Sequence, residues 1–177
     1  MQSRIAAFIG SYPLCQRGRI EQIAWLQRSG PRMPSYSRSV TIAASRESVW
    51  SVLADVAAWA DWLPTVNSVE PLDNRSLSPG ARFRILQPKL RPATWVVTQL
   101  EPPQRFVWES RSPGLVAIAD HIVEEHSPGH SSVVLRMTFS GMLSGPVGLL
   151  FRSITESYLS QEAAALKSRV EDRSKSQ

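Results

Sequence analysis

Cysteine is almost absent from the sequence, because Cys15 is the only one among 177 residues. A disulfide framework within the chain is therefore excluded, as is a cysteine zinc site or catalytic thiol after residue 32. Long apolar runs are absent too. The longest stretch without a charged residue, Met137–Phe151, has 15 residues and is interrupted by glycines and a proline. That stretch is too short and too interrupted to span a bilayer, so we predict no stable membrane insertion.

Several catalytic signatures are also missing. The chain has no glycine-rich phosphate loop, no serine nucleophile elbow and no pair of catalytic carboxylates. Its formal charge of +5 is unevenly distributed, because residues 1–32 hold five arginines and one acidic residue. The rest of the chain has 15 basic and 14 acidic residues. A nearly neutral body does not favour binding to nucleic acid, and we predict no such partner.

The first 38 residues differ from the rest, and we interpret 1–38 as an N-terminal extension. A short apolar pattern at Ile20–Leu26 is followed by Ser29–Ser35, which is rich in glycine and proline. Two explanations remain open: translation starts at Met33, or the extension is a native flexible segment. Residues 1–16 contain no convincing signal peptide, so we predict a cytoplasmic protein.

From Ser39 onward the pattern predicts one domain, 39–172, followed by a polar tail, 173–177. A short β-rich run, Ser39–Ala44, precedes Ser45, which can cap a helix from Arg46 to about Ala58. Period-two alternation then predicts a series of antiparallel strands at 66–72, 81–87, 94–101, 105–111, 115–126 and 132–140. Finally, an apolar stripe over Val147–Asp172 predicts a helix about 37 Å long. A sheet with one apolar face needs a cover, and this helix is the only amphipathic element of adequate length.

Four local motifs carry a resemblance to a known superfamily: AASRESVW at 43–50, WADWLP at 59–64, LEPPQRFVW at 100–108 and FSG at 139–141. Their order and spacing resemble the START-like (SRPBCC) superfamily, especially its polyketide cyclase/dehydrase-like branch, over about residues 39–171. The resemblance implies an α+β helix-grip fold, in which a curved antiparallel sheet wraps around a long C-terminal helix. A short helical region follows the first strand, and a cavity lies between sheet and helix. Such folds host many functions, so the match predicts the fold better than the chemistry.

A cavity of this kind ordinarily measures about 300–1,000 Å³ and is mostly apolar. Its candidate lining residues lie on the apolar faces of the strands and of the last helix. The alternative interpretation is that these side chains are simply packed core. The candidates from the strands are Phe83, Ile85, Phe106, Trp108, His121, Leu135, Met137 and Phe139, and those from the helix are Leu150, Ile154 and Tyr158.

His121 is the main polar candidate. It alternates with Ala119 and Val123, so we expect its ring to point inward, where a neutral imidazole can act as a general base or bind a ligand carbonyl. No partner that would orient the ring is apparent, which favours an ordinary hydrogen-bonded or surface histidine. The phenol of Tyr158 is a second catalytic candidate, although an interfacial tyrosine with a solvated hydroxyl fits equally well. No catalytic residue is firmly assigned.

We therefore predict that the protein binds a small hydrophobic or aromatic molecule, lipid- or polyketide-like, without covalent chemistry. The alternative is a cyclase/dehydratase-type enzyme in which His121 moves protons together with Tyr158 or Ser110. A third hypothesis is a quinone or lipid chaperone whose basic N-terminal segment touches acidic membranes. We expect a monomer or homodimer without a cofactor.

A group of acids and histidines around the Ser127–Gly129 turn has the composition of a metal site. Its side chains fall on both faces of a predicted hairpin, whereas zinc needs three or four converging ligands, so we predict no metal. The group is His121, Glu124, Glu125, His126 and His130. A second group, the arginines of the strands, is expected on a solvated exterior where each contributes little. These are Arg82, Arg84, Arg105 and Arg111.

Overall fold

The computed structural model describes residues 33–73 and 76–175. The predicted extension, 1–38, lies outside these described residues as far as residue 32, whereas Ser35–Arg38 belong to the first strand. The helices and strands follow in the order β1 (Ser35–Ile42), α2 (Arg46–Leu53), the 3-10 helix η1 (Val56–Asp61), β2 (Ser68–Pro71), β3 (Arg82–Leu86), β4 (Ala93–Glu101), β5 (Arg105–Ser112), β6 (Leu115–Ser127), β7 (His130–Ser140) and α3 (Ser144–Lys175).

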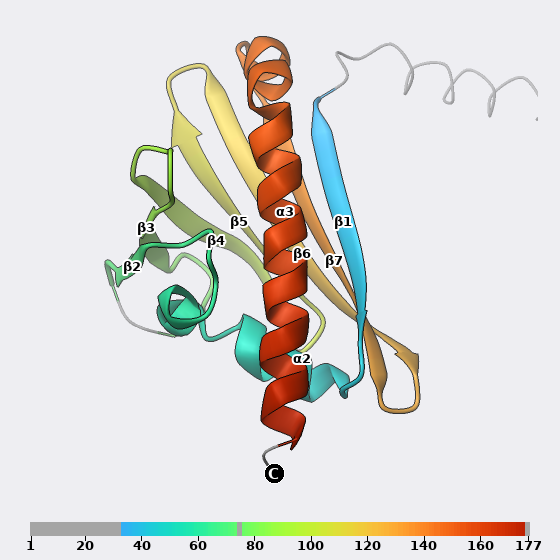
Figure 1. The fold of residues 1–177 in the computed structure, drawn as a ribbon. Helices are drawn as coiled ribbons and strands as arrows, with labels where there is room; N and C mark the ends of the chain where they lie inside the picture. The colour runs from blue at the N-terminus through green and yellow to red at the C-terminus, as the bar shows by residue number, and fades with distance from the viewer. Residues whose placement is uncertain (1–32, 74–75, 176–177) are drawn as a thin grey trace, which may run out of the picture. The chain divides into compact units, whose positions relative to one another are not determined.

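The seven strands found within the described residues form one antiparallel sheet in the order β1-β7-β6-β5-β4-β3-β2. Strands β2 to β7 pair with their neighbours in the chain, and β1 joins the sheet beside β7. Helix α3 lies across one face of this sheet (Figure 1). The predicted helix-grip arrangement is confirmed.

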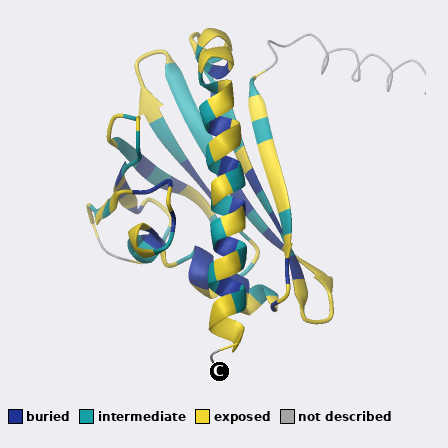
Figure 2. Ribbon diagram, viewed as in Figure 1, coloured by how far each residue is buried: buried dark blue, intermediate teal, exposed yellow. Residues whose placement is uncertain are grey.

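Alternation along the strands places the apolar side chains on the face that α3 covers. Phe106, His121 and Leu135 are cross-strand neighbours in β5, β6 and β7. All three side chains are buried. Figure 2 shows buried and exposed residues alternating along α3, and from Thr155 to Val170 the buried residues recur every three or four positions. The core is thus built from one face of the sheet and one stripe of the helix.

The helix after the first strand is shorter than predicted. Ser45 does cap it, since its Oγ accepts a hydrogen bond from the Ser48 N–H at 3.3 Å. However, the α-helix ends at Leu53 rather than Ala58, and a 3-10 helix follows. The indole Nε1–H of Trp59 donates to the Leu53 carbonyl at 3.0 Å, and so satisfies a carbonyl that the helix end leaves without an intrahelical partner. The prediction of a continuous helix to Ala58 was wrong. It rested on the spacing of the apolar residues alone, and that spacing contains no information about the contact between Trp59 and Leu53.

Helix α3 has 32 residues, more than predicted, and at about 1.5 Å per residue it is about 48 Å long. Near its end, the Glu171 carboxylate accepts the Ala43 N–H at 3.0 Å and pairs with Lys167 at 2.9 Å. The backbone hydrogen bond, followed by the bond to Lys167, holds the pKa of Glu171 below its ordinary value. Near its start, the Tyr36 hydroxyl donates to the Gly148 carbonyl at 2.9 Å. Both halves of the helix are therefore tied to the chain around β1.

Candidate ligand-binding site

A cavity of about 530 Å³ lies between the sheet and the first half of α3. Its walls come from four strands, from the loop between β3 and β4, and from one face of the helix. The apolar part of the lining consists of Leu90, Pro92, Ala93, Trp95, Leu115, Ala117, Met137, Phe139, Val147, Phe151, Ile154 and Leu159. Ser110 and Thr155 add hydroxyl groups, and Arg91 and Arg111 add charge. This space is mostly apolar with a few polar groups.

The space exists because the two halves of α3 have different neighbours. The second half packs on α2 and buries Leu166 and Val170 almost completely. The first half faces the sheet, and its residues Phe151, Ile154 and Tyr158 are only half-buried. The helix therefore seals the core at one end of the sheet and leaves a cavity at the other.

A second, smaller space of about 50 Å³ has mostly apolar walls into which a few polar side chains project, among them Thr65, His121 and Glu162. Thr65, Trp108 and His121 line only this inner space, whereas Trp95 and Glu162 also line the larger cavity. The two spaces therefore adjoin. Together they offer a mainly apolar compartment whose inner part holds the side chains of Thr65, His121 and Glu162.

His121 is buried in the wall of the inner space, with 5% of its side chain exposed. Its Nε2 lies 3.2 Å from Oε1 of Glu162, whose side chain is 15% exposed. Because a carboxylate accepts, Nε2 carries the proton and donates to it. The ring stacks on Phe106 with centroids 4.2 Å apart and an interplanar angle of 8°. Among the described residues, neither His121 Nδ1 nor Trp108 Nε1 has a hydrogen-bond partner.

Glu162 is the orienting partner that sequence reasoning missed. It lies four residues after Tyr158, so it occupies the same helix face one turn further on. That spacing could have indicated that Glu162 faces the site together with Tyr158. The contact with His121 itself could not be predicted, because the two residues are 41 positions apart in the sequence.

Tyr158 lines the larger cavity, and its hydroxyl donates a hydrogen bond to the Pro88 carbonyl. Burial raises the pKa of this phenol above its ordinary value. Its proton is therefore engaged by the loop between β3 and β4. Ser110 also lines only the larger cavity, so His121 is paired with Glu162 rather than with either predicted partner.

The predicted lining residues separate into walls and core. Ile85, Trp108 and His121 line the inner space, Met137 lines both spaces, and Phe139, Ile154 and Tyr158 line the larger one. Phe83, Phe106 and Leu135 line neither space and are at most 1% exposed. They pack behind the walls as core, which is the alternative that the sequence left open.

Leu150 does not face the sheet, since it is 77% exposed. The prediction for this residue was wrong. Successive residues of an α-helix are about 100° apart, so Leu150 and Phe151 cannot both point at the sheet. Phe151 takes the inward position and lines the cavity.

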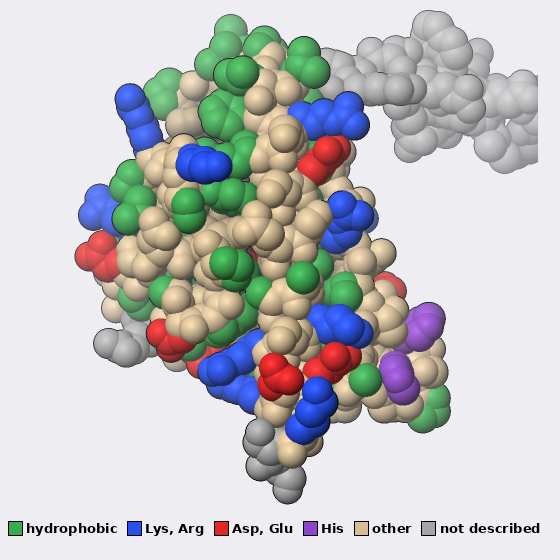
Figure 3. Space-filling view, in the orientation of Figure 1, with side chains coloured by type: hydrophobic (Ala, Val, Ile, Leu, Met, Phe, Trp, Pro, Cys, Tyr) green, Lys and Arg blue, Asp and Glu red, His purple; other side chains and the backbone are tan. Residues whose placement is uncertain are grey.

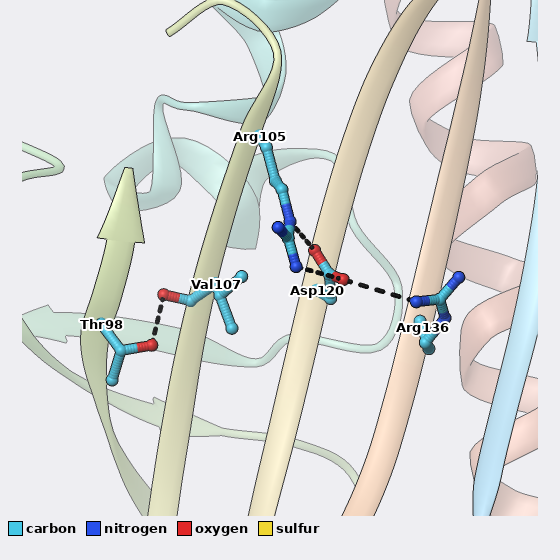
Figure 4. A network of polar contacts seen from close by, with 5 residues as sticks. All are labelled: Thr98, Arg105, Val107, Asp120 and Arg136. Carbon is cyan, nitrogen blue, oxygen red and sulfur yellow. Dashed lines mark hydrogen bonds and ion pairs between the residues drawn. The ribbon is translucent and has the colours of Figure 1, made fainter. Parts of the chain in front are cut away.

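On the outer face of the sheet, Arg105 and Arg136 form ion pairs with the same carboxylate, that of Asp120 (Figure 4). Arg105 donates two hydrogen bonds to the Asp120 carboxylate, at 2.8 and 3.0 Å, and Arg136 lies 3.7 Å away. Only 9% of the Asp120 side chain is exposed. The bond to Asp120 raises the pKa of Arg105. A bidentate pair with one shielded partner is stronger than the exposed pairs that we predicted for these arginines.

Within residues 33–73 and 76–175, no three side chains of metal-ligating type come close enough to share an ion. His126 and His130 lie exposed at the β6–β7 hairpin, away from His121. In the same part of the chain, no helix is long and apolar enough to cross a membrane.

Solved structures of similar shape support the fold. The Zhui aromatase/cyclase from a Streptomyces species matches with a TM-score of 0.66 and 21% identity, covering 80% of this chain and 96% of that one. Norcoclaurine synthase from Thalictrum flavum matches with a TM-score of 0.66 and 12% identity, covering 83% and 99%. A protein from Thermus thermophilus matches with a TM-score of 0.62 and 17% identity, covering 77% and 97%. At these identities the likeness concerns the fold alone.

Sequence comparison gives the family. No match was found among curated proteins. The family described as polyketide cyclase / dehydrase and lipid transport matches residues 33–171, most of the chain and nearly all of the described part. The motifs, the helix-grip architecture and this match agree, and the chain belongs to the polyketide cyclase / dehydrase and lipid transport family.

Proposed function

We propose that this protein binds a small, largely apolar molecule, lipid- or polyketide-like, in the cavity between the sheet and α3. The observation that carries the proposal is the cavity itself. Its volume of about 530 Å³ falls in the range of small-molecule sites, about 300–1,000 Å³. Its walls are mainly aliphatic and aromatic, so burial of apolar ligand surface would drive binding.

We expect the few polar side chains of the inner space to orient the ligand. An apolar body fits among Ala117, Phe139 and Ile154, and an oxygen-bearing end fits toward His121 and Glu162. The reverse orientation would bury the apolar end beside a carboxylate and leave that carboxylate less solvated, which is unfavourable. We therefore expect ligands with one polar end and a long apolar part.

Ala117→Trp tests this proposal because it fills the cavity from a position near the start of β6. We expect the affinity for the fluorescent probe 1-anilinonaphthalene-8-sulfonate to fall about tenfold or more, because the indole would occupy the space that the probe needs. Fluorescence titration measures the affinity. Ile118→Trp is the matched control, since it adds the same group on the other face of the same strand. Equal affinity of Ala117→Trp and the unmodified protein would rule out the cavity as the binding site.

The contact between His121 and Glu162 favours a second candidate function, acid–base catalysis of the cyclase/dehydratase type. The carboxylate of Glu162 holds the imidazole in one orientation. Because Nε2 is bonded to Glu162, Nδ1 is the nitrogen that would take a proton from the carbon next to a ligand carbonyl and return it to the departing hydroxyl group, which leaves as water. A histidine with an orienting partner is the arrangement that this chemistry needs.

The test of this second function is the dehydration of 4-hydroxy-4-phenylbutan-2-one to the conjugated enone, followed by absorbance. If the pair is catalytic, His121→Gln and Glu162→Gln each lower the rate by about 10²–10⁴-fold. Probe affinity in the same variants should change little, because the apolar walls are intact. If the unmodified protein does not accelerate the reaction above buffer, this catalytic function is wrong for this substrate class, and binding remains the better proposal.

A further inference from the structure

A group of large apolar side chains is exposed at the turn between β7 and α3 and on the first turns of that helix. Met142 is 92% exposed, Leu143 47%, Leu149 76% and Leu150 77%. We call these four residues the apolar tip. Figure 3 shows hydrophobic side chains gathered at this end of the molecule. Proteins seldom expose several neighbouring large apolar side chains unless the surface binds something.

The apolar tip borders the entrance of the cavity. The Leu143 N–H donates to the Gly114 carbonyl at 2.9 Å, which joins the tip to the β5–β6 hairpin. Val147 and Phe151, on the same turns of α3, line the cavity. The side chains of the tip therefore point outward from the segment whose inner side forms the cavity wall.

Basic residues surround this end of the domain. Lys89 and Arg91 are exposed in the loop between β3 and β4, Arg111 is near the end of β5, and Arg152 is on α3. We call these four residues the basic rim. Arg111 pairs with Glu109 at 2.7 Å and Arg152 with Glu156 at 3.0 Å. Among the described residues, Lys89 and Arg91 have no acidic partner, so the rim carries excess positive charge.

We propose that the apolar tip and the basic rim dock this protein peripherally on an anionic lipid bilayer. Met142, Leu149 and Leu150 would enter the boundary between headgroups and acyl chains, while the rim contacts anionic headgroups. A second copy of the chain fits this surface less well, because it would bring two positive rims together. Residues 1–32 fit less well for the same reason, since they contain five arginines and one acidic residue.

Docking in this way would place the cavity entrance at the bilayer surface, so that an apolar ligand could pass between bilayer and cavity without crossing water. The inference goes beyond the proposed binding function, because a cavity can hold its ligand without any bilayer. It also differs from insertion, since no element of the described chain needs to span the membrane.

The test is co-sedimentation of the full chain with vesicles of phosphatidylcholine and phosphatidylglycerol at a ratio of 7:3, compared with phosphatidylcholine alone. We expect binding to the anionic vesicles that weakens as salt is raised. Leu149→Glu with Leu150→Glu should abolish it. Lys89→Gln with Arg152→Gln should weaken it about tenfold or more, as expected for two basic residues at an anionic surface. Leu72→Glu and Arg173→Gln are matched controls on exposed residues at other sites and should bind normally.

Equal binding to both vesicle types, unchanged binding of the tip variants, or no binding at all would overturn the proposal. A dimer in sedimentation velocity that Leu149→Glu with Leu150→Glu disperses, without vesicle binding, would also overturn it and identify a second copy as the partner. Probe affinity in solution is measured on every variant. Because none of the substituted residues lines the cavity, normal probe binding separates failure of this inference from failure of the proposed function.

Discussion

Phe106→Ala is expected to lower the free energy of unfolding by about 3–5 kcal/mol, the range for removing a fully buried phenylalanine. The Phe106 side chain is 0% exposed and stacks on His121. It also packs edge-to-face against Trp50 and Trp108, with ring centroids 6.2 and 5.5 Å apart. Neither space in the site reaches this residue, so the substitution would open a new void. Chemical denaturation followed by circular dichroism measures the change.

Phe139→Ala is the matched comparison. Phe139 is also mostly buried, at 8% exposed, but it faces the larger cavity. Removing its ring would enlarge a space that already exists, so we expect a smaller loss of about 1–2 kcal/mol. The affinity for the fluorescent probe should change in this variant instead. Equal destabilisation by the two substitutions would contradict the separation of core from cavity wall.

Gly141→Ala is expected to lower the free energy of unfolding by about 2–4 kcal/mol, from backbone strain and overpacking together. Gly141 joins β7 to the turn before α3 and has φ +99°, a conformation that residues with a side chain rarely adopt. A Cβ at this position would lie 2.6 Å from the Gly114 carbonyl oxygen. Because that neighbour is backbone, the β5–β6 hairpin or the start of α3 would have to move.

Gly129→Ala separates the two causes. Gly129 also has a positive φ, +73°, but a Cβ there would meet nothing within 4 Å. We expect it to cost about 1 kcal/mol, from backbone strain alone. If thermal denaturation shows the same loss of stability for both variants, the contact between a Cβ at position 141 and the Gly114 carbonyl does not contribute to the destabilisation. If Gly141→Ala folds but alters probe affinity, the turn also determines how α3 borders the cavity.

The two adjoining spaces explain how one site can serve either proposed function. The larger space supplies apolar surface, and the inner space supplies a carboxylate and an imidazole already in contact. Ligand binding requires only the apolar surface of the larger space, whereas proton transfer also requires the imidazole and the carboxylate of the inner space. The Glu162→Gln variant therefore distinguishes the functions most directly, because it keeps the shape of the side chain and removes its charge.

The sequence by itself determined the order of the elements and the fold family. Period-two alternation marks strands with one apolar face, and the stripe of α3 marks a helix that must cover them. These patterns are local, because a side chain's face depends only on its position along a strand or helix. For this reason the strands and the long helix were found within a few residues of their bounds.

Only the tertiary structure decided which apolar residues are walls and which are core. Phe106 and Phe139 alternate alike in their strands, yet one is enclosed by other rings and the other faces empty space. The pairing of His121 with Glu162 and the end of α2 at Leu53 depend likewise on contacts with residues elsewhere in the chain. The distance between the helix and the sheet depends on the volumes of all the side chains packed between them. A local sequence pattern describes only neighbouring residues and therefore cannot predict this distance.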